Sequence, residues 1–309
     1  MSYVGAGSAD STAKLGTPFP VQPSIVGDMP TFHYRLVNVF AETLFGGNPL
    51  CVFEDARGLA DPQMQALALQ FNLSETTFIL PSTVATARVR IFTPTFEMAF
   101  AGHPTLGSSH VVRTLTQCGN ALTLEMKAGV ISVTARNNHW TLKAGAVTSR
   151  DCEKSDAELA AMLGLDTSDI LQGARWINTG SEQLIIPLAA ADAVRRVIPK
   201  PDLLAGVASD VGRSMAYVFA NNSNGDGKLL SRFFFMKHGS VVEDPGTGSA
   251  TANLGGWMAY HHRVPCLYSI EQGVQVGRAC HLGLEVNNTG DILVSGRVIE
   301  IGCGTVNLE

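Results

Sequence analysis

Short runs rich in apolar, aromatic and β-branched residues recur along the chain from residue 31 onward. Such runs, separated by turn-forming residues, are typical of β-strands. A fold dominated by β-sheet is therefore expected. Strands are predicted at residues 34–40, 50–55, 76–81, 87–94, 216–220 and 229–236, with a three-stranded meander over residues 122–145 and further strands after residue 270.

Helical spacing appears in fewer segments than the strand pattern. Asp61-Pro62 predicts a helix N-cap followed by proline, and Met64 and Leu67 then recur at the spacing of one helix face. Residues 155–165 predict a short amphipathic helix that opens the second half of the chain. Single helices among many short strands predict an α+β fold rather than regular βαβ units.

Two glycine-rich stretches carry little bulk where a core helix would normally have Leu and Ile. They read FAGHPTLGSSHVV at residues 100–112 and EDPGTGSATANLGG at residues 243–256. The pattern His-Pro-x-x-Gly-Ser, which starts at His103, returns as Asp-Pro-x-x-Gly-Ser from Asp244. Each stretch predicts a helix that is buried on nearly all sides, because it has little polar face and its small residues let strands approach closely.

The repeat extends beyond these two stretches. Residues 90–92 (Arg-Ile-Phe) precede the first stretch by nearly the same distance as residues 232–234 (Arg-Phe-Phe) precede the second, and Phe78 and Phe219 match in the same order. A repeated order of motifs predicts an ancestral duplication, with two similar domains that face each other. In this alignment His103 and Asp244 are equivalent, and we expect them to approach one cleft from opposite domains.

The two glycine-rich turns are candidates for ligand binding. A turn that opens a helix exposes unpaired backbone N–H groups at the positive end of the helix dipole, which favours anions. Two such turns related by a pseudo-twofold axis predict a carboxylate pocket between the domains. The alternative is two glycine-rich helix starts without a ligand.

A carboxylate in the segment NLSETTF is the candidate for acid/base chemistry. Glu75 follows a predicted helix and precedes an apolar strand, with Ser74 beside it as a cap or ligand contact. The second half has Met215 or Ala216 where Glu75 would repeat. A scaffold with symmetric binding loops and one unmatched acid is what a one-base enzyme would look like, although a solvated edge carboxylate is the simpler interpretation.

Composition narrows the classes of function. The 309 residues are 45% hydrophobic and 16% charged with a net charge of −5, and they contain no basic run, which argues against nucleic acid as a partner. No apolar run approaches the roughly 20 residues that span a bilayer. Six cysteines stand singly, and neither zinc-ligand spacing nor a nucleotide-binding loop is present, so we expect no metal or cofactor. Residues 1–29 are expected to be a poorly ordered extension without a targeting pattern, which favours the cytoplasm.

Five segments together resemble the phenazine-biosynthesis-like (PhzF) isomerase family: FGGNPLCVF, NLSETTFIL, VRIFTPTFEMAFAGHPTLGSSHVV, NTGSEQLIIPL and EDPGTGSATANLGGWM. The resemblance covers residues 31–309. It implies the diaminopimelate epimerase-like fold, in which two pseudo-symmetric domains each wrap a barrel-like sheet around a central helix. The expected organisation is an N-terminal extension (1–29), a first domain (30–148) completed by a C-terminal strand near 297–309, and a second domain (149–296).

The resemblance also implies roles for individual residues. The family's general acid/base falls on Glu75 and its supporting polar residues on His103 and Asp244. Substrate contacts fall on Ser74, Gly102, Gly248 and Ser249. This chain has Gly246 where the family more usually has Ala. The paired cysteines of diaminopimelate epimerases are replaced by Ala101 and Asp244, so thiol epimerisation is not expected.

A single carboxylate that removes a proton can return it only on the same face of its substrate. Together with this argument, the resemblance implies a cofactor-independent isomerase of a small carboxylate, with a homodimer as the candidate assembly. Burial between the domains would have to raise the pKa of Glu75 toward neutrality for it to act as base and acid. Two alternatives stay open: an epimerase- or lyase-type proton transfer on the same scaffold, and a non-catalytic member that binds proteins.

Overall fold

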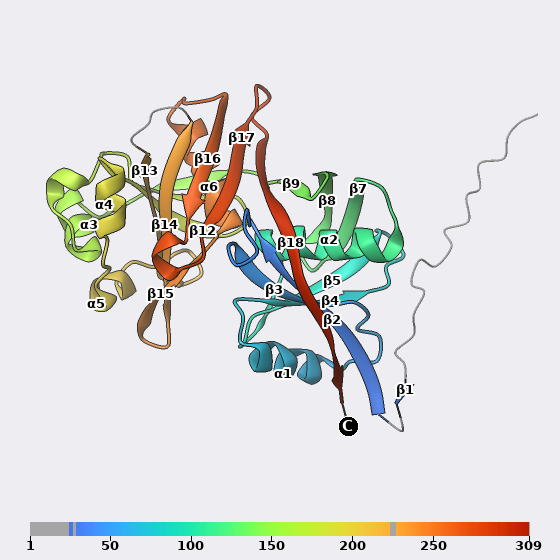
Figure 1. Ribbon diagram of the computed structural model, residues 1–309. Helices are drawn as coiled ribbons and strands as arrows, with labels where there is room; N and C mark the ends of the chain where they lie inside the picture. The colour runs from blue at the N-terminus through green and yellow to red at the C-terminus, as the bar shows by residue number, and fades with distance from the viewer. Residues whose placement is uncertain (1–24, 27–28, 223–226, 309) are drawn as a thin grey trace, which may run out of the picture.

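The computed structural model describes residues 25–26, 29–222 and 227–308. The predicted extension over residues 1–29 lies almost entirely outside these ranges. The described chain forms two lobes joined by hydrogen-bonded strands (Figure 1). The helices are α1 (Asp61–Phe71), α2 (Gly102–Thr116), α3 (Asp156–Leu163), α4 (Ala191–Arg196), α5 (Pro201–Ala205) and α6 (Gly248–Tyr260), with 3₁₀ turns η1 (Thr167–Asp169) and η2 (Val274–Val276).

The strands include the predicted ones and the meander, and also others that were not predicted, such as those between residues 148 and 187. They are β1 (Ile25–Val26), β2 (Met29–Val39), β3 (Asn48–Phe53), β4 (Thr76–Leu80), β5 (Ala87–Phe92), β6 (Glu97–Met98), β7 (Ala121–Met126), β8 (Gly129–Arg136), β9 (His139–Lys143), β10 (Thr148–Asp151), β11 (Arg175–Asn178), β12 (Glu182–Pro187), β13 (Met215–Asn221), β14 (Lys228–Lys237), β15 (Ser240–Asp244), β16 (Cys266–Gln272), β17 (Cys280–Val286) and β18 (Ile292–Asn307).

A closed barrel forms the first lobe. Its strands pair in the order β2, β3, β4, β5, β7, β8, β9 and β18, and β18 returns to β2. Helix α2 runs through this barrel and is buried from Gly102 to Val112. A Cβ at Gly107 would lie 2.6 Å from Leu50 Cδ2. The small residues of the first glycine-rich stretch are therefore required by the close approach of the barrel wall.

The second lobe repeats this arrangement around α6. Strands β11, β12, β13, β14, β16 and β17 curve around the helix, which is buried over most of its length. A Cβ at Gly255 would lie 2.7 Å from Ile292 Cγ2, and one at Gly256 would lie 2.8 Å from Ile177 Cγ2. The α+β class and the two helix-centred lobes confirm the predicted fold.

Strand β18 belongs to both lobes. Its first residues, from Ile292, pair with β17, and the segment from Val298 to Asn307 pairs with β2. Figure 1 shows β18, in red, running from the second lobe into the first. The C-terminal segment thus closes the first barrel, although the domain boundaries at 148/149 and 296/297 stay a prediction.

The remaining helices cover outer faces of the sheets. Helices α3, α4 and α5 share an apolar core with β12, β13 and β14, whereas α1 packs on β3, β4 and β5. Ser155 caps α3 by accepting a hydrogen bond from the Glu158 N–H. The predicted N-cap at Asp61 is wrong by one residue: Ala60 is the N-cap, because the Gln63 side chain accepts a hydrogen bond from its N–H and takes over the capping role.

Candidate active site

One cavity of about 510 Å³ lies between the ends of α2 and α6 and is lined by both lobes. The cavity brings together every residue for which a site role was predicted. They are Ser74, Glu75, Gly102, His103, Asp244, Gly248 and Ser249. Apolar side chains from Phe40, Met98, Phe100, Met215, Phe233 and Phe235 form much of the remaining wall. A largely apolar cavity with a few convergent polar groups is typical of a small-molecule site.

Two equivalent ion pairs show which residues of the two lobes correspond to each other. Arg90 on β5 pairs with Glu97 on β6 (Nε–Oε1, 2.8 Å), and Arg232 on β14 pairs with Glu243 on β15 (Nη2–Oε2, 2.7 Å). Each guanidinium also lies over the phenylalanine ring two residues further along its strand, at 5.0 and 4.7 Å from the ring centroid. The two strand pairs are therefore built in the same way.

This register corrects the predicted equivalence of His103 and Asp244. Because Asp244 follows the glutamate of its ion pair directly, its counterpart in the first lobe is Met98. His103 is the second residue of α2, so its counterpart is Ser249, the second residue of α6. The matching letters mislead because Glu243 follows Arg232 by 11 residues whereas Glu97 follows Arg90 by only 7, and this difference shifts the alignment inside the repeat.

Each of the two acids of the cavity has a methionine at the equivalent position of the other lobe. Strand pairing places Thr76 opposite Phe92 and Ala216 opposite Phe234, which makes Glu75 and Met215 equivalent. The first lobe thus supplies Glu75 and Met98, whereas the second lobe supplies Met215 and Asp244 at the respective equivalent positions. Of the two residues considered for the counterpart of Glu75, Met215 is the one that the register supports.

Glu75 and His103 face each other inside the cavity. The distance from Glu75 Oε2 to His103 Nε2 is 3.4 Å, and the side chains are only 15% and 6% exposed. The His103 ring also donates a hydrogen bond to the backbone carbonyl of Pro49. Since proline has no N–H and the other ring nitrogen faces Glu75, the donor is Nδ1, and the neutral ring presents the lone pair of Nε2 to Glu75.

Burial moves both pKa values in the direction of the neutral forms. It raises the pKa of Glu75 to about 8, and the nearby charge of Asp244 adds to the effect. Burial also lowers the pKa of His103 to about 3, so this ring stays neutral. Neither Glu75 Oε2 nor His103 Nε2 has a hydrogen-bond partner among the described residues. Both atoms are thus free to bond to a ligand, and Glu75 can gain or lose a proton near neutral pH.

Asp244 is held by groups from both lobes. Asn48 Nδ2, at the start of β3, donates to Asp244 Oδ1 over 3.1 Å, and the Thr247 hydroxyl donates to Oδ2. These bonds and the Gly246 N–H favour the charged form, but burial is the larger influence and the pKa of Asp244 is raised. Sequence reasoning missed Asn48 and Thr247, although both lie inside the segments FGGNPLCVF and EDPGTGSATANLGG.

A buried amide chain determines how the Ser249 hydroxyl is oriented. Asn253 Oδ1 accepts from the Thr179 N–H (2.9 Å) and Asn253 Nδ2 donates to the Ser181 carbonyl (2.8 Å), so backbone groups fix its amide orientation. Asn253 Nδ2 also donates to Gln183 Oε1 (2.8 Å), which leaves Gln183 Nε2 to donate to Ser249 Oγ (2.9 Å). Ser249 is therefore an acceptor within the protein. Its own hydrogen has no acceptor in the described part of the chain.

The amino ends of α2 and α6 meet beside these residues. A Cβ at Gly102 would lie 3.4 Å from Gly248 Cα, so the two helices approach head to head. Neither helix has a side-chain hydrogen bond at its N-cap, Ala101 or Thr247. The first-turn N–H groups of both helices therefore remain available to a negatively charged ligand.

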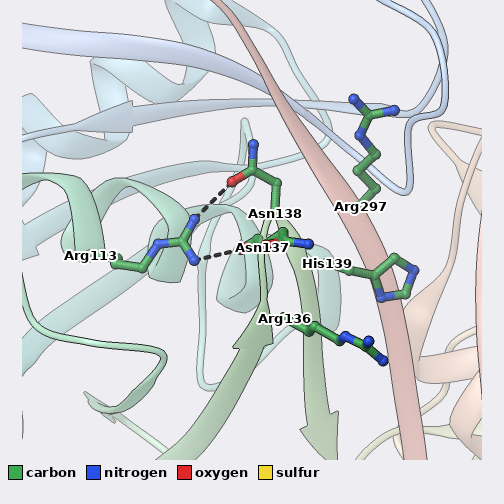
Figure 2. A pocket seen from close by; sticks show the side chains of 6 residues that line it. All are labelled: Arg113, Arg136, Asn137, Asn138, His139 and Arg297. Atoms are coloured by element: carbon green, nitrogen blue, oxygen red, sulfur yellow. Dashed lines mark hydrogen bonds between the residues drawn. The ribbon is translucent and has the colours of Figure 1, made fainter.

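Other sites in the described residues are less suited to a ligand. No group of His, Cys, Asp or Glu there could hold a metal ion, and no described helix is long and apolar enough to cross a bilayer. A concavity of about 520 Å³ is lined by Arg113, Arg136, Asn137, Asn138, His139 and Arg297. Figure 2 shows that its three guanidinium groups point in different directions, and Arg113 already donates to Asn137 O and Asn138 Oδ1. Its cations do not converge on one anion.

Comparison with known proteins agrees with this architecture. An uncharacterized isomerase of Pasteurella multocida is 42% identical over 278 residues, 88% of this chain and 93% of that protein. The trans-2,3-dihydro-3-hydroxyanthranilate isomerase of Pseudomonas chlororaphis is 32% identical over 288 residues, covering 89% and 99% of the two chains. A crystal structure of a PhzF-family protein from Bacillus anthracis shares the fold with a TM-score of 0.80, at 24% identity, over 90% of this chain and 99% of that one. Since residues 37–302 also match the family described as phenazine biosynthesis-like protein, the chain belongs to this PhzC/PhzF family of isomerases.

Proposed function

We propose that this protein is a cofactor-independent isomerase that moves a proton and a double bond within a small carboxylate, with Glu75 as the only acid/base. The observation that carries this proposal is the Glu75–His103 contact, in which a buried carboxyl with a pKa of about 8 faces a neutral imidazole inside the cavity. The equivalent place in the second lobe is taken by Met215, which cannot transfer a proton.

The reaction requires no change of oxidation state. Ionised Glu75 removes a proton from a substrate carbon, and the electrons of that C–H bond form a new double bond. The electrons of the original double bond move to its far carbon, where protonated Glu75 returns the proton on the same face. The helix N-termini and the Ser249 hydroxyl hold the substrate carboxylate and the developing negative charge. His103 and Asp244 bind the polar substituents and set the proton affinity of Glu75.

We propose a cyclic amino-carboxylate related to trans-2,3-dihydro-3-hydroxyanthranilate as the substrate class. The name of the Pseudomonas chlororaphis relative supports this choice. The polar groups around the cavity support it as well, because Asp244 and His103 can hold amino and hydroxyl substituents while the helix N-termini hold a carboxylate.

The test is an assay of the purified protein with trans-2,3-dihydro-3-hydroxyanthranilate in heavy water, with and without EDTA. We expect turnover that EDTA does not change. The carbon that gains the proton should carry deuterium or the transferred hydrogen, on the same face of the substrate from which the proton was removed. Exchange at one stereocentre with inversion would indicate an epimerase instead. Absence of both turnover and exchange, across related cyclic carboxylates, would favour a non-catalytic member.

We further propose that the protein works in the cytoplasm and as a homodimer. All six cysteines are free, and this supports a reducing compartment. The dimer rests on the family resemblance, and size-exclusion chromatography with light scattering tests it.

A further inference from the structure

Two positive charges line the cavity. They belong to Arg213, just before β13, and Lys237, the last residue of β14. Arg213 is exposed and Lys237 is half-buried. Among the described residues, the carboxylates that line the cavity are Glu75 and Asp244, and burial raises the pKa of both. The acids thus lie in a desolvated part of the cavity, whereas Arg213 lies at an exposed position.

The register of β13 and β14 relates the two cations. Met215 pairs with Phe235, and the Met236 N–H donates to the Ser214 carbonyl over 3.0 Å. Continuing this register by one residue places Arg213, just outside β13, opposite Lys237. Like charges that face each other across paired strands destabilise a sheet unless a counter-charge is present. Among the described residues, no carboxylate lies within ion-pair distance of either side chain.

The Arg213 guanidinium contacts the first lobe, because it lies 5.2 Å from the centroid of the Phe96 ring, which belongs to that lobe. Phe96 lines the cavity as well, so this cation–π contact joins the two lobes at the cavity. Lys237 is followed by the tight turn His238-Gly239, where φ is +50° and +77°, and β15 then returns toward Asp244.

We propose that Arg213 and Lys237 form a subsite for a second acidic group of the substrate, separate from the carboxylate held at the helix N-termini. The inference rests on the proposed function because it assumes that the first carboxylate binds at α2 and α6. The ligand class is then a dianionic cyclic carboxylate. A single ring held beside Glu75 leaves part of the 510 Å³ for such a substituent.

Calorimetric binding of three probes tests the subsite: 2-amino-3-hydroxybenzoate, its 3-carboxymethoxy derivative and its 3-phosphonomethoxy derivative. We expect the two dianions to bind at least tenfold more tightly than the monoanion, and the better of the two identifies the acidic group. The double variant R213Q/K237M should lose this preference and bind the monoanion as before. The control R136Q removes an exposed arginine outside the cavity, and it should change neither affinity.

Two results would overturn the subsite and leave the proposed function intact. One is equal affinity of the wild type for the monoanion and the dianions. The other is a loss of the preference for dianions in R136Q as large as that in R213Q/K237M. If no aromatic probe binds, the proposed substrate class fails, and malonate then tests the cations alone. The subsite predicts that malonate raises the Tm of the wild type and of R136Q more than that of R213Q/K237M. The same rise in all three proteins would exclude it.

Discussion

Burial decides the chemistry of the Glu75–His103 contact. In water a Glu carboxyl ionises above about pH 4.5 and a His imidazole is protonated below about pH 6.5, so the two would form an ion pair between these pH values. Inside the cavity, desolvation disfavours both charges, and it raises the pKa of Glu75 while lowering that of His103. The proton therefore stays on the carboxyl until the pH approaches about 8. A group poised in this way can both accept and return a proton during one turnover.

Replacing Glu75 with Gln keeps the size of the side chain and removes its ability to take up a proton. We expect turnover to fall at least about 100-fold, or about 2.7 kcal/mol in barrier, while binding of 2-amino-3-hydroxybenzoate persists. Steady-state kinetics and calorimetry on the same preparation measure the two effects. Near wild-type turnover would move the acid/base role to another group, with His103 as the first to test.

The raised pKa of Glu75 predicts how stability depends on pH. The folded protein holds a proton that the unfolded chain releases near pH 4.5, so Glu75 stabilises the fold in full below that pH and not at all above about 8. Glutamine carries no charge at any pH. The difference in Tm between Glu75→Gln and wild type should therefore grow in favour of the variant from about pH 5 to about pH 8. A difference that is constant with pH would show that the pKa is not raised.

The amide chain behind Ser249 predicts a coupled effect on binding. Gln183→Met keeps the side-chain length but removes the donor to Ser249 Oγ, so the hydroxyl is no longer oriented by its neighbour. One hydrogen bond of about 1 kcal/mol corresponds to about a fivefold loss of affinity for the carboxylate probe. Ser249→Ala should weaken binding as well, and the double variant should bind no worse than Ser249→Ala alone. Additive losses would mean that Gln183 acts independently of Ser249.

The residues that the sequence could identify are those with a local signature. Glu75, His103 and Asp244 stand out because each lies in a motif, and all three line the cavity. Asn48 and Gln183 also lie in quoted segments, but they act through hydrogen bonds to partners far along the chain, so a local pattern does not show their roles. The roles of all these residues stay predictions until variants are measured.

At the scale of elements, most strands and helices follow from runs of apolar, aromatic and β-branched residues or from helical spacing. Strands β4 and β13 are buried along nearly their whole length and not on alternate residues. The repeat itself is also visible in the sequence. Its register is not, because the segment from Arg232 to Glu243 is longer than that from Arg90 to Glu97, and glycine-serine letters occur at several places in both helices. The ion pairs of Arg90 and Arg232, together with the strand pairing, show which residues are equivalent.

The turn before α6 offers a test of how closely this element packs. A Cβ at Gly246 would lie 2.7 Å from Cys280 Sγ and 3.2 Å from Phe40 Cδ2. Gly246→Ala, the residue usual in the family, should therefore destabilise this chain by about 1–3 kcal/mol. Cys280→Ala removes the sulfur, so adding it to Gly246→Ala should recover part of the loss. Chemical denaturation of the four proteins measures the coupling, and purely additive costs would contradict it.

At the scale of the whole molecule, β18 makes the two lobes one hydrogen-bonded sheet. A chain that ends at Arg297 keeps the residues of β18 that pair with β9 but lacks the segment that pairs with β2, so the first barrel is left open along β2. We expect this truncation to abolish cooperative unfolding and expose the α2 core. A chain that ends at Leu308 keeps every β18 pair and is the matched control. A truncated protein with the same Tm as the control would show that the barrel does not need its last strand.

The path of β18 has a consequence for recombination among members of this family. The residues that complete the first barrel are encoded after those of the second lobe. A single crossover near residue 148 would join a barrel from one parent to the closing strand of another. Every contact that β2 makes with the segment from Val298 to Asn307 would then be between residues of different parents. Chimeras that keep each core intact therefore need two crossovers, with the C-terminal strand inherited from the same parent as the N-terminal half.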